Sequence, residues 1–294
     1  MAGGVDDHLN GGLHARGYAS AEDGLIWETF LGEDLVVQCP DPGDEEMVSR
    51  AVFLLTHARE SGARVPAVVD YSEAPPAYLA VENVGSTQLS AVRNGDRGRE
   101  LRAVESAGEA LGGVHAAAGF GYGEIEGPEY RQGGHPTWRA FAEDLVERTL
   151  EFTAGGPFES VTRRVARAFE PGTVPETPDS SVLHADFHGS NVVLDGDDRA
   201  WAIDLDNAIY GDSRFDYVRV LRRTAGADAE ARAAFREGYE RAHGLALDGA
   251  LRDQYVLLSI AKGAEDGEWV RRNSAVDTGD WVESLDEWYR ERFG

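Results

Sequence analysis

Polar and ionisable residues gather in one short stretch of the chain, between apolar runs. Residues 184–191 read HADFHGSN, and a further acid, Asp204, follows the next apolar run. The apolar segments on either side of the turn residues 196–198 predict a β-hairpin. If that turn centres between residues 197 and 198, Asn191 and Asp204 lie opposite each other across the two strands.

An amide oxygen beside a carboxylate predicts a site for a hard divalent cation. Mg²⁺ takes oxygen ligands and keeps several waters, which phosphate oxygens can replace. Asp186 lies five residues before Asn191, so it can reach the same cavity as a carboxylate that holds no metal and accepts a proton from a substrate hydroxyl. Asn191 and Asp204 are therefore candidate metal ligands. Asp186, accompanied by His184, is the candidate catalytic group.

Each of these residues also has a purely structural interpretation. Asp186 is equally typical of a turn or a helix cap, Asn191 of a strand edge, and His184 of a buried histidine with a satisfied hydrogen bond. A different chemistry also remains open, because His184, Asp186 and His188 could ligate a transition metal in a hydrolase. The pairing of Asn191 with Asp204 favours magnesium instead.

The first eighty or so residues predict a small, β-rich lobe with one helix. β-rich runs alternate with turn residues, and only one segment has helical spacing of its apolar positions. Residues 17–24, with glycine at each end, fit either a loop over phosphates or an ordinary turn. The expected elements are strands at 24–31, 34–39, 65–69 and 78–81 and a helix at 45–61.

Beyond a connector at 82–86 the apolar spacing becomes mostly helical, interrupted by the polar segment 180–216. The fold class that follows is α+β with two lobes, a small β-rich lobe over residues 1–84 and a larger, mostly helical lobe over residues 85–294. Thr137 is placed to cap one helix. The expected helices are 101–118, 138–150, 161–169, 228–243, 251–261 and 281–293.

Composition and charge exclude several classes of protein. The chain has 294 residues, 42% of them hydrophobic, which is typical of a folded globule and not of a disordered chain. Its 53 acidic and 28 basic side chains give a formal charge of −25, which disfavours nucleic acid and anionic membranes as partners. Residues 1–10 lack a signal segment, and no run approaches the roughly 18 apolar residues of a membrane span, so we expect a cytoplasmic protein.

Two residue types are almost missing from the chain. A single cysteine, Cys39, excludes an intramolecular disulfide and a cysteine zinc cage. Lys262 is the only lysine, and the excess of acids over bases suits a cytosol with a high salt concentration, where carboxylate repulsion is screened. A melting temperature that stays level in molar KCl would contradict that hypothesis.

The polar segment resembles the aminoglycoside phosphotransferase family, relatives of the protein kinases that include choline and fructosamine kinases. The family's loop reads His-Gly-Asp-x-x-x-x-Asn, and residues 184–191 match it with alanine in place of glycine at position 185. Ile203-Asp204 resembles the family's later Ile-Asp motif, which continues through Gly211-Asp212 to Asp216. Weaker likeness extends upstream through 138–141 and 111–115.

The resemblance implies a protein-kinase-like fold and a small-molecule kinase that uses Mg²⁺ and ATP or GTP. It implies Asp186 as catalytic base, Asn191 and Asp204 as metal ligands, and Asp216 as a structural carboxylate that braces the loop. The segment 81–85 would be the hinge that holds the purine, with Glu82 and Val84 as its contacts. Positioning and charge stabilisation supply most of the catalysis in this chemistry.

The phosphate-binding half of the resemblance is incomplete. The family's basic residue on the third strand, usually lysine, corresponds here to Gln38, and its helix glutamate to Glu46 or, second, Glu45. A lost charge-assisted contact to phosphate costs about 1.5 to 3 kcal/mol. Arg16, Arg50 or Arg64 could take its place. If none does, the chain is a nucleotide-binding module without turnover, which is the alternative to an active kinase.

The acceptor is a small molecule with a hydroxyl group, and the sequence leaves its identity open, as it does the oligomeric state. Five acids near the C-terminus could bind a cationic acceptor, although solvated surface is the commoner reason for such a cluster. They are Glu265, Asp266, Glu268, Asp277 and Asp280.

Overall fold

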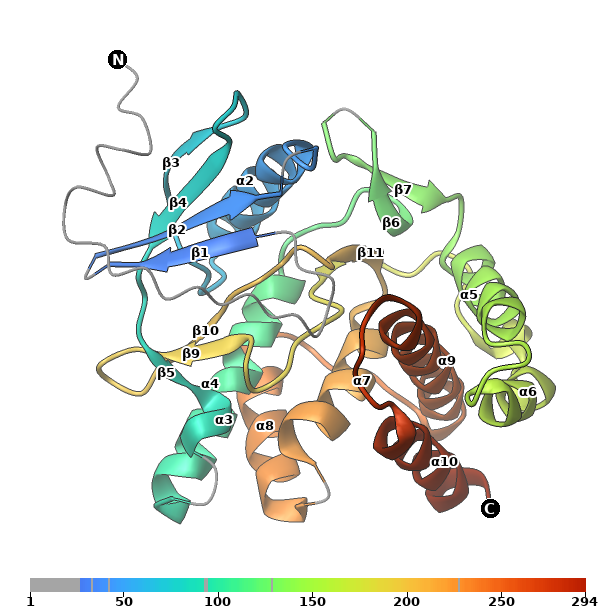
Figure 1. The fold of residues 1–294 in the computed structure, drawn as a ribbon. Coiled ribbons are helices and arrows are strands. Elements are labelled where there is room, and N and C mark those ends of the chain that lie inside the picture. The colour runs from blue at the N-terminus through green and yellow to red at the C-terminus, as the bar shows by residue number, and fades with distance from the viewer. Residues whose placement is uncertain (1–26, 33, 42, 93–94, 128, 227) are drawn as a thin grey trace.

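The computed structural model describes residues 27–32, 34–41, 43–92, 95–127, 129–226 and 228–294. Figure 1 shows a small sheet with one helix at one end of the molecule and a larger, mostly helical part below it, which confirms the predicted two-lobed α+β architecture. The segment 17–24, the first residues of the predicted strand 24–31, and Arg16 lie outside the described residues. The predicted boundary at residue 84 falls in the connection between the lobes.

The small lobe is one antiparallel sheet covered by one helix. Its strands are β1 (Trp27–Leu31), β2 (Leu35–Pro40), β3 (Val68–Ser72) and β4 (Tyr78–Glu82), in the order β1-β2-β4-β3, and its helix is α2 (Glu46–Glu60). The β1-β2 hairpin and the helix are confirmed. β3 begins three residues later than predicted, because Pro66 has no amide hydrogen to pair and fixes its own φ.

Two further sheets form the interface between the lobes and the base of the site. β5 (Thr87–Gln88), β9 (Val192–Leu194) and β10 (Ala200–Ala202) pair in the order β10-β9-β5. β6 (Tyr122–Glu126), β7 (Gln132–His135), β8 (Ser181–Leu183) and β11 (Ile209–Gly211) pair in the order β7-β6-β11-β8. The candidate catalytic loop therefore runs from the end of β8 to the start of β9.

The β6-β7 hairpin was not expected from the sequence, because its glycines are poor strand formers. They are needed for close contact: a Cβ at Gly133 would lie 2.1 Å from the Tyr122 amide nitrogen. Pairing with β11 supplies the stability that the local sequence lacks.

The helices of the large lobe confirm the predicted helical half and add two helices that were not predicted, the short α3 and α7. Thr137 caps α5 as expected, accepting a hydrogen bond from the Ala140 amide at 3.0 Å. α9 continues twelve residues past its predicted end at Ala261, through Gly263 and Gly267, which are poor helix formers. The helices are α3 (Leu89–Val92), α4 (Arg97–His115), α5 (Trp138–Phe152), α6 (Glu159–Ala168), α7 (Ser213–Ala225), α8 (Ala229–Ala242), α9 (Gly249–Asn273) and α10 (Gly279–Phe293), with a 3-10 turn at Pro171–Thr173.

α4 and α8 cross in backbone contact within the core. A Cβ at Gly238 would lie 1.9 Å from the carbonyl oxygen of Glu105, and one at Gly108 would lie 2.1 Å from that of Phe235. This contact brings His115, at the end of α4, within hydrogen-bond distance of Tyr239 on α8. His115 in turn reaches the catalytic loop region, as described below.

No helix of the described residues combines the length and the apolar character needed to cross a lipid bilayer.

Candidate active site

The polar hairpin forms, but its predicted register is wrong by one residue. Val192 faces Ala202 in the ladder, and the Ile203 amide donates to the Asn191 carbonyl at 3.0 Å, so Asn191 lies opposite Ile203 and not Asp204. The turn centres on Asp197. Asp195 accepts the amides of residues 197 and 199, and Asp198 takes a positive φ of 60°, which makes an odd-numbered loop.

Asp186 and Asp204 nevertheless line the same cavity, of about 1080 Å³. Asp204 follows β10 and has a φ of 63°, a left-handed conformation that turns the chain away from the strand. Met47 and Arg50 of the small lobe line this cavity as well. The two acids therefore share a chamber to which both lobes contribute.

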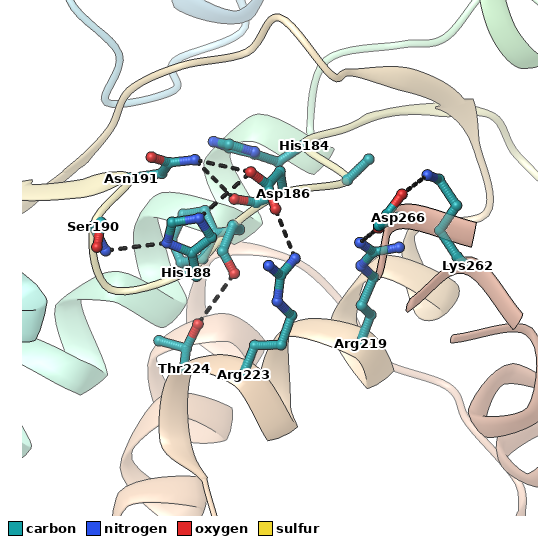
Figure 2. Close-up of polar contacts among 12 residues, drawn as sticks. His184, Asp186, His188, Ser190, Asn191, Arg219, Arg223, Thr224, Lys262 and Asp266 are labelled. Carbon is teal, nitrogen blue, oxygen red and sulfur yellow. Dashed lines mark hydrogen bonds and ion pairs between the residues drawn. The ribbon is translucent and has the colours of Figure 1, made fainter. Parts of the chain in front are cut away.

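Asp186 is held by hydrogen bonds on both carboxylate oxygens (Figure 2). Its Oδ1 accepts from Arg223 Nη1 at 2.7 Å, and its Oδ2 accepts from Asn191 Nδ2 at 3.3 Å and lies 3.4 Å from His188 Nε2. Burial alone would raise the pKa of Asp186, but the His188 hydrogen bond and the Arg223 charge hold that pKa well below its usual range. Asp186 is therefore an ionised carboxylate at neutral pH, the form a proton acceptor needs.

Asp204 has the opposite electrostatic character. Burial, together with the nearby carboxylates of Asp206 and Asp186, raises the pKa of Asp204 to about 6. This crowding of negative charge is what a divalent cation relieves, and carboxylate and amide oxygens are the donors that Mg²⁺ prefers. Asn191 is buried and uses its amide nitrogen on Asp186. Asn191 is not among the described residues that line the cavity, so the fit to magnesium rests on Asp204, and Asn191 remains a predicted ligand through its amide oxygen.

Asp204→Asn is expected to stabilise the protein in the absence of metal. The folded-state pKa lies above the ordinary value of 3.8, so the ionised carboxylate costs folding free energy that appears as pH rises from about 4 to 6. The gain should be on the order of 3 kcal/mol at pH 7.5, by the size of the pKa shift, and should shrink towards pH 4. Chemical denaturation in EDTA at both pH values measures it.

The same titrations with added Mg²⁺ should stabilise the parent and leave Asp204→Asn unchanged. Asp197→Asn, on the exposed turn, is the control and should behave as the parent does. A variant less stable than the parent at both pH values would contradict the electrostatic assignment.

Asp216 anchors the catalytic loop from below. Its Oδ2 accepts the amide of His184 at 2.9 Å, the amide of Ala185 at 3.3 Å, and a hydrogen bond from His115 Nε2 at 3.1 Å. Burial works to raise the pKa of Asp216, but the His115 hydrogen bond and the charges of His115, His184 and Arg219 together lower that pKa. Asp216 thus has the bracing position that the resemblance implies.

His184 is fully buried and does not line the cavity. Its Nε2 lies 2.9 Å from the carbonyl oxygen of Ile203, and its ring packs edge-on against Phe187. This contact ties the loop to the end of β10. His188 accepts the Ser190 amide at its Nδ1. The hydrolase alternative needs His184, Asp186 and His188 together, but His184 Nε2 is engaged by the Ile203 carbonyl. The described residues include no group of three or more His, Cys, Asp or Glu side chains placed to hold a metal.

Ala185 occupies a backbone conformation that favours glycine, with a φ of 61°. Left-handed alanine costs about 1 kcal/mol or more. Ala185→Gly is therefore expected to keep or raise the melting temperature and to leave turnover intact. Ala107→Gly, the same change in a buried position of α4, should lower stability by about 1 kcal/mol. A fall in stability for Ala185→Gly as large as that of the control would contradict this account.

The residues predicted to bind the nucleotide are only partly brought to the cavity. Gln38 lies in β2 opposite Leu79, and Glu46 is exposed at the start of α2; neither lines the cavity. The amide of Glu82 donates to the Ala67 carbonyl at 2.9 Å. The Val84 amide donates no hydrogen bond to another described residue, so it can donate one to a ligand.

Arg50 is the basic residue that the small lobe contributes to the cavity. Its Nη2 donates to the Ala208 carbonyl at 2.8 Å, and its Nε is buried without a partner among the described residues. Arg64 instead bonds Ser106 and Glu109, away from the site. Arg50 lies one turn after Glu46 on the same helix. This spacing is the only feature of the sequence that would have placed Arg50 near the site.

Two arginines at the site, Arg219 and Arg223, were not predicted from the sequence, and they lie beside Lys262 and Asp266. Arg219 and Arg223 lie on α7, and Lys262 and Asp266 lie on α9, at the cavity wall beside Asp186. The spacing of three and then four residues from Asp216 to Arg219 and Arg223 would have indicated one helix face.

A family model described as the phosphotransferase enzyme family matches residues 14–253. Among solved structures, a thermostable mutant of aminoglycoside phosphotransferase APH(4)-Ia, in a ternary complex with AMP-PNP and hygromycin B, is 20% identical with a TM-score of 0.65, covering 92% of both chains. A choline/ethanolamine kinase family protein from Mesorhizobium loti is 15% identical with a TM-score of 0.64, covering 96% of this chain and 88% of its own. No curated protein sequence matches the chain. At these identities the structures show a shared fold.

Proposed function

Because the chain belongs to the phosphotransferase enzyme family, we propose that it transfers the γ-phosphate of ATP or GTP to a hydroxyl group of a small molecule. One observation carries this proposal: an ionised carboxylate, Asp186, and a crowded acidic group, Asp204, line one cavity to which both lobes contribute. A proton acceptor and a cation-binding acid in one chamber are what phosphate transfer to an alcohol requires.

In this proposal Asp186 orients the acceptor hydroxyl and takes its proton. Asn191 and Asp204 would hold Mg²⁺, which would supply positive charge that stabilises the phosphate oxygens. His184 and Asp216 are positioning residues, because they hold the loop backbone through Ile203 and through the amides of residues 184 and 185.

The hinge segment would hold the purine through its backbone. The unoccupied amide of Val84 and the carbonyl of Glu82 are the groups we assign to this contact, since the Glu82 amide is already used by Ala67. These backbone groups suit adenine and guanine alike. Gln38 and Glu46 keep their assigned roles only if the small lobe moves them towards the phosphates.

Arg50 supplies the positive charge that Gln38 lacks. Its buried, unpartnered Nε and its place on the cavity suit a phosphate oxygen. Arg50→Gln should therefore raise the KM for nucleotide about tenfold or more. Arg64→Gln, which alters a neighbouring small-lobe arginine engaged elsewhere, should leave that KM within twofold. Equal KM values for Arg50→Gln and the parent would contradict this role.

Transfer of label from γ-³²P-ATP and γ-³²P-GTP to a panel of hydroxyl compounds, with Mg²⁺, tests the function directly. We expect transfer to at least one compound and its loss in EDTA. Absence of transfer by the parent, together with activity gained in Gln38→Lys, would favour the alternative of a nucleotide-binding module without turnover. Absence of transfer to every compound in the panel would overturn the proposal, whether or not the chain binds nucleotide.

A further inference from the structure

The cavity wall next to Asp186 carries basic side chains from two helices. Arg223 on α7 donates to Asp186, and Arg219, one turn earlier, donates from Nη2 to Asp266 Oδ2 at 2.6 Å. The ammonium of Lys262, on α9, contacts the other oxygen of Asp266. Figure 2 shows Arg223 pointing to Asp186 and Arg219 pointing to Asp266. The wall is therefore a row of cations held in place by two carboxylates.

The charge of the cavity lining differs from that of the chain as a whole. The chain has 53 acidic and 28 basic residues, whereas six of each line the cavity. Asp186 and Asp204 belong to the catalytic and metal positions, so the remainder of the lining carries six basic and four acidic side chains and is net positive. The six basic residues are Arg50, Arg148, Arg219, Arg223, Lys262 and Arg272.

Arg219 has an unmet hydrogen-bonding requirement. The residue is only 4% exposed, it lines the cavity, and its Nη1 is buried without a partner among the described residues. A buried guanidinium N–H without an acceptor costs free energy, and most buried polar groups in folded proteins are satisfied. An oxygen of a bound ligand is the missing acceptor.

Three of the five acids that the sequence offered for a cationic acceptor are already neutralised. Glu265 accepts from Arg148 at 2.9 Å, and Asp266 is shared by Arg219 and Lys262. Glu268 is fully buried and paired with two arginines, 271 and 272. A cationic acceptor would find no uncompensated carboxylate among these three, so the expectation from the sequence that they bind a cation is not supported.

We propose that the acceptor is an anionic hydroxyl compound, whose carboxylate or phosphate group binds Arg219 and Arg223 while its hydroxyl meets Asp186. This inference rests on the proposed function and names its substrate class. The anion would occupy the vacant Nη1 of Arg219 and draw Arg223 away from Asp186 Oδ1, which leaves that oxygen to accept a proton. Arginine suits this role because its planar donors match carboxylate and phosphate oxygens.

The step balances without a further reactant. The hydroxyl oxygen of the acceptor forms a bond to the γ-phosphorus, and the bond from that phosphorus to the bridging oxygen of the β-phosphate breaks. The hydroxyl proton passes to Asp186, and the nucleoside diphosphate leaves with the bonding electron pair.

Four small compounds with the same diol test the charge preference: glycerol, glycerate, glycerol 3-phosphate and 3-amino-1,2-propanediol. Their dissociation constants are measured by calorimetry on the full chain with Mg²⁺ and AMP-PNP, in one KCl buffer. We expect glycerate or glycerol 3-phosphate to bind at least tenfold more tightly than glycerol and the amine, by the strength of one charge-assisted contact. If glycerate has the lower dissociation constant, the recognised group is a carboxylate; if glycerol 3-phosphate has the lower one, it is a phosphate.

Variants of α7 assign the preference to its residues. Arg223→Gln should remove most of the anion preference while leaving nucleotide affinity within twofold. At the buried position 219, a neutral side chain could prevent folding, so the variant there is Arg219→Lys, which keeps the charge. Arg222→Gln is the matched control, because Arg222 pairs with Glu291 at 2.7 Å, away from the cavity. It should bind all four compounds as the parent does.

Tighter binding of the amine, no measurable binding of either anion, or an anion preference that survives both variants would overturn the inference. So would a loss of nucleotide affinity in Arg223→Gln without a change for the anions, because it would assign Arg223 to the nucleotide. These binding measurements need no turnover. Failure of label transfer to any hydroxyl compound would instead overturn the proposed function, so the two failures are distinguishable.

Discussion

Replacing Asp186 with asparagine is expected to lower the rate of phosphate transfer by about 10²- to 10⁴-fold, the usual contribution of a positioned acid or base. Asparagine keeps the size of the side chain and can still contact Asn191 and Arg223, but it accepts no proton. Because Asp186 is not assigned to the nucleotide, the KM for nucleotide should change little. Initial rates of label transfer at saturating acceptor measure the effect on kcat.

The pH profile gives an independent test of the same residue. His188 and Arg223 hold the pKa of Asp186 well below its usual range. Asp186 should therefore stay ionised as pH falls from 8 to 6, and its protonation should not lower the kcat of the parent over that range. Asp197→Asn, on the exposed turn of the same hairpin, is the matched control and should keep parent activity. A kcat for Asp186→Asn within threefold of the parent would remove Asp186 from the reaction.

Asp216→Ala is expected to have the largest effect on stability, a loss of about 3 to 5 kcal/mol. Removing this fully buried carboxylate leaves two backbone amides and His115 without an acceptor. The melting temperature should fall by roughly 10 °C for a chain of this size. Scanning calorimetry or thermal circular dichroism measures the change.

The folded-state pKa of Asp216 lies below its ordinary value, so the stability that it contributes is present above the unfolded pKa and is lost as pH falls through the folded value. The cost of Asp216→Ala should therefore be largest near neutral pH. Asp253→Ala removes an exposed partner of Arg292 and should cost less than about 1 kcal/mol. Equal melting temperatures for these two variants would show that the network does not brace the loop.

The sequence predicted the elements whose patterns are local. Helical spacing places α2, α5 and α10 close to their observed bounds, and a capping threonine marks the start of α5. The two-lobed fold followed from the change of period near residue 85. α7 was missed because the polar motif that ends at Asp216 hid the apolar face of the same segment, which includes Phe215, Val218 and Val220.

The hairpin shows why a correct element can carry a wrong register. Its two strands were predicted, but the register depended on whether the turn has an even or an odd number of residues. The side chain of Asp195 accepts hydrogen bonds from two backbone amides and so fixes an odd number of residues in the turn. The alternation of apolar residues along the strands carries no information about these hydrogen bonds. Asp186 and Asp204 still share a cavity because both lie beyond the strand ends.

The acceptor wall could not be predicted from local patterns. It forms where α7 meets α9, and its central pair, Arg219 and Asp266, is separated by 47 residues. Arg50 was one of three substitutes that the sequence left open, and only its contact with Ala208, 158 residues away, places it beside the site. Gln38 and Glu46 remain predictions.

The position of Lys262 makes the cavity accessible to selective chemical labelling. The ε-amine of the chain's only lysine lies on the cavity wall, 23% exposed and in contact with Glu265 and Asp266. An amine-reactive acylating reagent therefore has two targets in the whole chain, this side chain and the N-terminal amine. Intact-mass spectrometry with and without an added compound would show whether that compound protects Lys262 from the reagent, without knowledge of how the compound binds.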